Sequence, residues 1–172
     1  MAVGVRRTTL TDVARRAGLS RMTVYRRFPD VAALIQALMT REFSGVLTDA
    51  VAANADRATV RERIAHGATE GVVRLSGDPL FLRLLDVDPE LLLPYVVQRH
   101  GAFQHLVLDT LVALLAEGME EGSIRPTDPV ALAAALELCL RGWVLAARAD
   151  DPDELRARAR TELRPILDGA LR

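Results

Sequence analysis

The residues between positions 21 and 27 combine side-chain types that contact nucleic acid. The segment RMTVYRR contains three arginines, which bind phosphate oxygens or the edge of guanine. Its hydroxyl groups can bond phosphate, and threonine and methionine offer methyl groups to thymine. Val24 and Phe28 lie four residues apart and would turn inward on a helix. We therefore expect an outward face made of Arg21, Met22, Tyr25 and Arg26, with Thr23 at its edge.

A first short helix must hold this segment in place. Thr9 with Asp12 three residues later is a capping-box pattern, so a helix should begin at Leu10. Gly18 should end it, because a left-handed terminal residue costs glycine nothing sterically. Ala14 is also small, and two helices that cross steeply over a short turn need such small contacts.

The second helix should begin after Ser20, which is a good N-cap, and run from Arg21 to Phe28. Pro29 should stop it, because proline cannot donate to the helical hydrogen-bond ladder. The alternative interpretation is an ordinary helical hairpin with a basic solvated face. Turn chemistry, capping and charge agree with each other, which favours a nucleic-acid-binding helix pair.

Residues 9–28, TLTDVARRAGLSRMTVYRRF, with Pro29, Asp30, Ala33 and Leu34 after them, resemble the TetR family of bacterial transcriptional regulators. The resemblance implies an all-α protein: a helix-turn-helix head joined by a long helix to a C-terminal helical bundle that binds ligand and dimerises. Under this hypothesis the phosphate contacts come from Thr9, Arg21, Tyr25 and Arg27. The base-edge contacts come from Arg21, Met22, Thr23 and Arg26.

Two features depart from the family pattern. Residues 1–8 leave no room for the amphipathic helix that precedes the helix-turn-helix, so either the start lies upstream or the head is truncated. We therefore expect part of the apolar face formed by Leu10, Val13, Val24 and Phe28 to be exposed. Val31 stands where many members place a lysine near the DNA backbone, which removes one expected phosphate contact.

Charge is distributed unevenly along the chain. Residues 1–43 hold 8 Arg and 3 acidic residues, a net charge of +5, whereas residues 44–172 hold 14 Arg and 20 acidic residues, a net charge of −6. A basic head on an acidic body fits a head that docks on phosphate. We divide the chain accordingly, into a truncated head with the start of the connecting helix at 1–43 and a ligand-binding and dimerisation domain at 44–172.

Composition favours an all-helical protein, because half of the residues are hydrophobic and aromatics are few. No apolar run approaches the roughly 18 residues of a membrane span, and the start lacks the apolar core of a signal peptide. We expect a cytoplasmic protein without a membrane partner, in which Cys139 is a buried small hydrophobe. After the head, we expect helices over about 31–53, 59–75, 80–85, 90–97, 99–121, 129–149 and 152–171.

Two further expectations concern the body. The last two long helices carry excess apolar surface, which a second copy would bury, and the resemblance implies a homodimer through the same helices; burial within one chain is the alternative. The resemblance also implies an internal site, whose aliphatic lining would suit a small hydrophobic effector. Residues of these types more often pack in a core than contact a ligand, and the candidate set is His66, Phe81, Leu84, Tyr95, His100, Phe103, Leu106 and Trp143.

Enzyme chemistry is not indicated. His100 and His105 are five residues apart, on different sides of a helix, and no metal-ligand spacing is present. The sequence has no Gly-rich phosphate loop and no nucleophile elbow. We therefore predict no catalytic residues, no metal and no cofactor.

The sequence predicts a regulator that binds a double-stranded, palindromic operator, and more specifically a repressor relieved by an effector in the body. The alternative is a helical dimer that binds a ligand or protein partner and whose degenerate head does not bind DNA. The missing first helix and Val31 motivate that alternative.

Overall fold

The computed structural model describes residues 8–87, 101–146 and 153–172, and these residues form helices without any strand. The all-α prediction is therefore confirmed for the described part of the chain. The helices are α1 (Leu10–Arg16), α2 (Arg21–Arg27), α3 (Val31–Ala53), α4 (Val60–Ser76), α5 (Pro79–Val87), α6 (Ala102–Glu121), α7 (Pro129–Leu145) and α8 (Asp153–Leu171).

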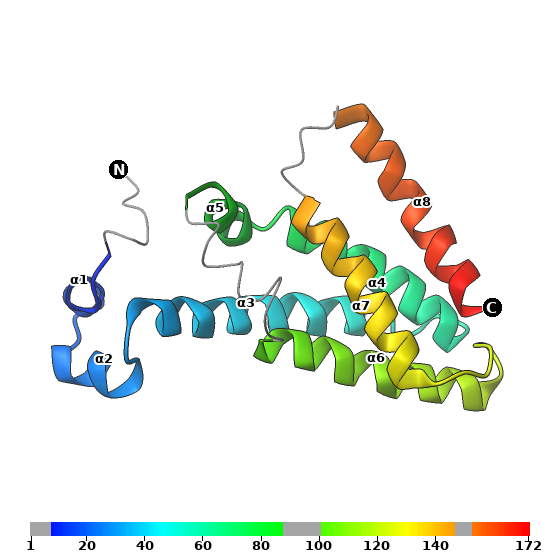
Figure 1. The fold of residues 1–172 in the computed structure, drawn as a ribbon, viewed down its shortest axis with the longest axis horizontal. Helices are drawn as coiled ribbons and strands as arrows, with labels where there is room; N and C mark the ends of the chain where they lie inside the picture. The colour runs from blue at the N-terminus through cyan, green and yellow to red at the C-terminus, as the bar shows by residue number, and fades with distance from the viewer. Residues whose placement is uncertain (1–7, 88–100, 147–152) are drawn as a thin grey trace.

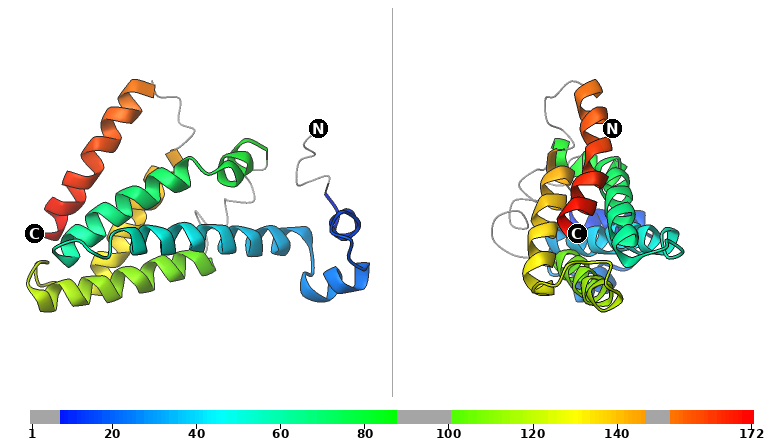
Figure 2. Two further views of the ribbon diagram at one scale, coloured as in Figure 1. Left: turned by 180° about the vertical axis from the view of Figure 1, so that it is seen from behind. Right: turned by 90° about the vertical axis from the view of Figure 1, so that its right-hand side faces the viewer.

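The long helix α3 connects the two parts of the molecule (Figure 1). The pair α1 and α2 lies at its N-terminal end, α5 lies nearer the head than the other body helices, and α4, α6, α7 and α8 gather along its C-terminal half and beyond. Helix α4 is central to the body, where it packs against α3, α6, α7 and α8. The C-terminus lies at the opposite end of the molecule from the head (Figure 2).

The head helices begin and end where local chemistry requires. The Thr9 side chain accepts a hydrogen bond from the backbone N–H of Asp12, and Ser20 accepts one from Thr23, so both expected N-caps are present. Gly18 has a φ of +66°, a conformation that side-chain-bearing residues rarely adopt. Asp30 accepts a hydrogen bond of 2.7 Å from the backbone N–H of Ala33 and starts α3.

A small apolar cluster closes the head. Leu10, Ala14 and Val24 are buried, and Phe28, Val31 and Leu34 pack against them. Part of the face that was expected to be exposed is accessible, because Val13 and Phe28 are only half-buried. Leu10 and Val24 are covered, since the first turns of α3 supply apolar side chains. Val31 is partly buried and packs against this cluster.

The body has one larger core. Its largest fully buried side chains are Leu115 of α6 and Leu163 and Leu171 of α8. The α7 and α8 faces are only partly covered, since Leu138 and Ile166 are about three-fifths exposed at 60% and 59%. Cys139 is also exposed, so its predicted burial is wrong: helical periodicity gave α7 a wide apolar face without indicating which part of it the body covers.

Some of the predicted helix positions fall outside the described residues. The predicted helix 90–97 lies outside the described residues, as do the first two residues of the predicted helix 99–121, the last three of 129–149 and the first of 152–171. Pro165 lies inside α8, which runs uninterrupted from Asp153 to Leu171. In the described ranges, α6 alone is long and apolar enough to cross a membrane by length and composition, contrary to expectation. Core helices of soluble proteins share these properties, and α6 packs on α3, α4 and α7.

Candidate nucleic-acid interface and internal cavity

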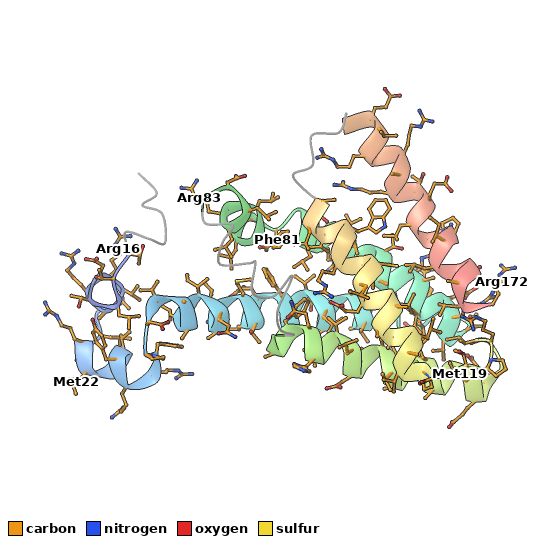
Figure 3. The ribbon with its side chains drawn as sticks, in the orientation of Figure 1. Arg16, Met22, Phe81, Arg83, Met119 and Arg172 are labelled. Atoms are coloured by element: carbon orange, nitrogen blue, oxygen red, sulfur yellow. The ribbon has the colours of Figure 1, made fainter. Side chains whose placement is uncertain are left out.

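Helix α2 is exposed to solvent around most of its circumference and buries a single side chain. Val24 is 6% exposed and faces α1, whereas Met22 is 77% and Tyr25 50% exposed. The other outward residues predicted on α2 are exposed as well, namely Arg21, Thr23, Arg26 and Arg27. Met22 projects from the end of the head that faces away from the body (Figure 3). All of the α2 candidates are therefore accessible from solvent.

Two candidate hydroxyl groups already have local partners. The Thr9 hydroxyl donates to Asp12 Oδ2 at 2.7 Å, and this hydrogen bond is the main cause that lowers the pKa of Asp12. Thr23 and Ser20 share a hydrogen bond of 2.8 Å between their hydroxyl oxygens. Thr9 therefore caps α1, and it does not belong to helix α2.

The basic character of the head comes from arginines at the ends of its helices. Arg15 and Arg16 lie in the last turn of α1, and Arg26 and Arg27 in the last turn of α2. Arg15 forms an exposed ion pair with Asp12, and the Arg27 guanidinium stacks over the Phe28 ring at 5.9 Å. Positive side chains at helix C-termini also interact favourably with the helix dipole.

A cavity of about 190 Å³ that is partly open to solvent lies in the body. It is bounded by residues of α3, α4, α5, α6 and α7, and it reaches the C-terminal half of the connecting helix. Its wall is mostly aliphatic and aromatic. Phe43 of α3 lies at the centre of an edge-to-face aromatic cluster, 5.9 Å from Phe81 and 5.7 Å from Phe103 between ring centroids.

Charged residues also line this cavity, and none of them was predicted. Glu137 is buried and its carboxylate lies 3.0 Å from the guanidinium of Arg141, one turn later on α7. Arg63 of α4 pairs with Glu117 at 2.7 Å. The sequence did carry a signal: a glutamate in the apolar stretch LELCL with an arginine four residues later.

The predicted cavity residues are divided among several places. Phe81 and Phe103 line the cavity, while Trp143 lines a second cleft of about 560 Å³ together with Cys139 and residues of α8. Leu84 packs in the core and Leu106 is 40% exposed. Tyr95 and His100 lie outside the described residues.

His66 lies on α4 outside both cavity walls. Burial lowers the pKa of its imidazole, and the nearby charges of Arg57 and Arg164 lower it further. His66 therefore favours the neutral state more than a free histidine does. Across the described parts of the chain, no group of His, Cys, Asp and Glu side chains has the arrangement of a metal site.

Comparisons with known proteins agree with this architecture. Residues 1–38 match the family model described as bacterial regulatory proteins, tetR family. The chain is 33% identical over 168 residues to the HTH-type transcriptional regulator Rv2250c of Mycobacterium tuberculosis, covering 98% of this chain and 86% of that protein. The regulator Mb2274c of Mycobacterium bovis matches to the same extent.

Solved structures show the same fold at lower identity. The TetR family repressor AlkX from Dietzia sp., implicated in the biodegradation of n-alkanes, has a TM-score of 0.62 and 23% identity, covering 99% of this chain and 90% of that one. The transcriptional regulator FadR from Bacillus subtilis, in complex with stearoyl-CoA, has a TM-score of 0.62 and 15% identity, covering 98% and 91%. With the sequence relatives, these matches show that the chain belongs to the TetR family of bacterial helix-turn-helix transcriptional regulators, a family of DNA-binding proteins and not of enzymes.

Proposed function

We propose that the protein reads its operator through α2, which lies in the major groove. The observation that carries this proposal is the exposed α2 face, with Val24 alone turned inward. In this arrangement Arg21, Met22, Thr23 and Arg26 approach base edges, and Thr9, Arg21, Tyr25 and Arg27 hold phosphates. The compact apolar cluster of the head supports this function over the alternative of a degenerate head.

The second part of the proposal is that a hydrophobic effector occupies the cavity and relieves repression. The mostly apolar wall supports it, because pockets of this kind gain affinity from apolar burial and orient ligands with a few polar groups. The structural neighbours implicated in n-alkane degradation and bound to stearoyl-CoA also favour an effector with an alkyl chain.

Helix α3 provides the physical connection between the two sites. Val31 and Leu34 near its start pack in the head cluster, whereas Phe43 and Ala50 farther along line the cavity. A ligand that moves the C-terminal half of α3 therefore moves the head. A coupling of about 1–3 kcal/mol between the two sites is typical of such regulators.

The active form is proposed to be a cytoplasmic homodimer that binds a palindromic operator. Helix-turn-helix dimers read half-sites about 34 Å apart, so two heads are needed. The partly covered faces of α7 and α8 support pairing through these helices, since exposed apolar side chains gain from burial by a second copy. These side chains include Val130, Leu138, Leu155 and Ile166.

A gel-shift titration with DNA from upstream of the protein's own coding region tests the DNA-binding part. Arg26→Ala should weaken binding about tenfold, because a good contact between arginine and a base is worth about 1–3 kcal/mol. Arg74→Ala is the matched control, since Arg74 is an arginine of α4 that pairs with Glu70 and Asp49 far from the head. Affinity should fall steeply with salt.

The results separate the two candidate functions. Unchanged affinity of Arg26→Ala would contradict the groove assignment. If the wild-type protein forms no sequence-specific complex, or if its binding does not depend on salt, the alternative of a ligand-binding or protein-binding dimer is favoured.

A further inference from the structure

The second cleft, of about 560 Å³, lies between α7 and α8, with the C-terminal end of α4 as its floor. Both α7 and α8 pack against α4 (Figure 1). Small residues on both sides leave this space open, namely Gly142 and Ala146 on α7 and Ala159 on α8. Small-molecule sites usually have volumes of about 300–1,000 Å³, so the cleft is large enough for a ligand. Among the described residues it shares only Val72 with the first cavity.

The floor of the cleft contains a serine that is almost completely buried. Ser76, the last residue of α4, is 7% exposed and lines the cleft, and its hydroxyl makes no hydrogen bond within the described ranges. The hydroxyls of Thr69 and Thr110, by contrast, each donate to the carbonyl one turn earlier at 2.7 Å. Because buried polar groups normally have a partner, the Ser76 hydroxyl is left for a ligand to bind.

The wall of the cleft carries positive charge without a compensating carboxylate. Arg156 and Arg160 of α8 line the cleft four residues apart, and no acidic residue is among its described lining residues. Arg156 has an interaction partner of its own, whereas Arg160 forms no ion pair and no hydrogen bond in the described part of the chain. Like charges at this spacing on a helix repel each other. The Arg160 guanidinium therefore favours an anionic group in the cleft.

The rest of the wall suits a flat, apolar ligand. Trp143, the single tryptophan of the chain, lines the cleft together with Leu155 and Val72. Aromatic rings that stack in an offset or edge-to-face arrangement contribute more than the burial of their area alone. The indole ring therefore favours an aromatic ligand over an alkyl chain, which gains from burial but makes no ring contact.

We propose that this cleft is a second ligand site, which binds a small aromatic carboxylate independently of the effector cavity. The carboxylate pairs with Arg160, the ring packs against Trp143, and Ser76 supplies a hydrogen bond from the floor. Hydrogen bonds between a guanidinium and a carboxylate are roughly twice as strong as neutral ones. A second copy of the chain is a poorer occupant, because a two-fold interface would bring the same arginines together again and add no negative charge.

Isothermal titration of the full chain with 2-naphthoate and with 2-naphthamide tests the recognition, because the two probes share a ring system and differ in charge. Wild-type protein should bind the acid about tenfold or more tightly than the amide. Arg160→Met should remove this preference, and the variant should fold because it leaves no buried partner charge behind. Arg164→Met is the matched control, since Arg164 lies one turn later on α8, is exposed and does not line the cleft.

Two measurements locate the binding. The chain has one tryptophan, so a heteronuclear NMR spectrum contains a single indole N–H signal, which 2-naphthoate should shift. Gly142→Leu should abolish binding by filling the cleft, because a Cβ atom at this position meets no atom within 4 Å and the variant should fold. Gly45→Leu on α3, which is equally unobstructed, is the control. Binding of dodecanoic acid, an alkyl probe for the first cavity, should be the same in wild type and Gly142→Leu.

Each part of the proposal has an outcome that would overturn it. Equal wild-type affinities for the acid and the amide, or a preference that survives in Arg160→Met, would contradict the role of Arg160. An unchanged indole signal, or full binding of 2-naphthoate by Gly142→Leu, would place the bound probe outside the cleft. If neither probe binds, the second site does not exist, and loss of a dimer in Gly142→Leu would then show that a second copy fills the cleft.

Discussion

The backbone N–H of Val60 donates a hydrogen bond of 2.9 Å to Oε2 of Glu121, which joins the first turn of α4 to the last residue of α6. The Ser123 hydroxyl donates to the same oxygen at 2.6 Å and accepts a hydrogen bond of 3.3 Å from the N–H of Arg61. The first N–H groups of a helix have no partner within it. The segment after α6 therefore completes the capping of α4 that Thr59 begins.

We predict that Glu121→Gln lowers stability near neutral pH and that its effect fades in acid. The hydrogen bonds from Ser123 and from the backbone of Val60 hold the pKa of Glu121 below its ordinary value. A carboxylate with a lowered folded-state pKa stabilises the fold above its unfolded-state pKa, and this contribution is lost as the pH falls through the folded value.

Urea unfolding of both proteins at neutral pH and from about pH 5 downward measures this effect. The difference between wild type and variant is the informative quantity, because Asp12 and Glu70 also have lowered pKa values and change both proteins equally. Glu120→Gln, at an exposed position one residue earlier, is the control. A difference that stays constant throughout the acid range would contradict the prediction.

Gly118 allows α6 to approach its neighbours closely. A Cβ atom at this position would lie 2.7 Å from Cγ1 of Ile124 and 3.3 Å from Cβ of Val60. We predict that Gly118→Ala costs about 1–3 kcal/mol of unfolding free energy through overpacking, and that adding Ile124→Ala reduces this cost. Gly45→Ala on α3 is the control, because it meets no atom within 4 Å and should stabilise by about 0.5–1 kcal/mol. Equal effects of the two alanines in thermal unfolding would contradict this account.

The head and body cores are separate clusters, which predicts that damage to one spares the other. Val24→Ala should destabilise the head by about 1–3 kcal/mol and weaken operator binding, because it removes buried methyl groups beside Leu10 and Ala14. Ligand binding in the cavity should stay unchanged. Hydrogen exchange of residues 10–34 and titration with dodecanoic acid measure the two effects.

Leu19→Ala is the control, because Leu19 is 52% exposed on the same head, and it should change stability by less than about 0.5 kcal/mol. A parallel loss of ligand binding in Val24→Ala would show that the clusters are coupled.

Local chemistry made the helix boundaries predictable. The Thr9 and Ser20 caps and the left-handed Gly18 lie where the sequence indicated, and α3 runs over the predicted residues 31–53. Each of these features depends on residues within a few positions of one another. The contact between Val60 and Glu121 joins residues 61 positions apart, so no local pattern could indicate it.

The candidate site was predictable to different degrees in its two parts. The outward side of α2 could be predicted because Val24 and Phe28, four residues apart, lie on the same inward side of one helix. The cavity needs side chains from five helices, so sequence spacing indicated Phe81 and Phe103 but not Glu137 or Arg141. Cys139 was predicted to be buried because periodicity shows which residues share a face, not whether the same chain covers that face.

The proposed dimer makes a final prediction about α7. Leu138 is 60% exposed, and Ala131, Ala134 and Ala135 are exposed small residues on the same helix that would let a second copy approach closely. Leu138→Glu should therefore dissociate the dimer, since it would bury an unpaired charge at the interface. Sedimentation velocity should give a monomer, and operator affinity should fall with it because one head alone reads half of a palindrome. Val73→Glu is the matched control on α4, where Val73 is 42% exposed, and it should stay dimeric. A Leu138→Glu protein that remains dimeric would place the interface elsewhere on the molecule.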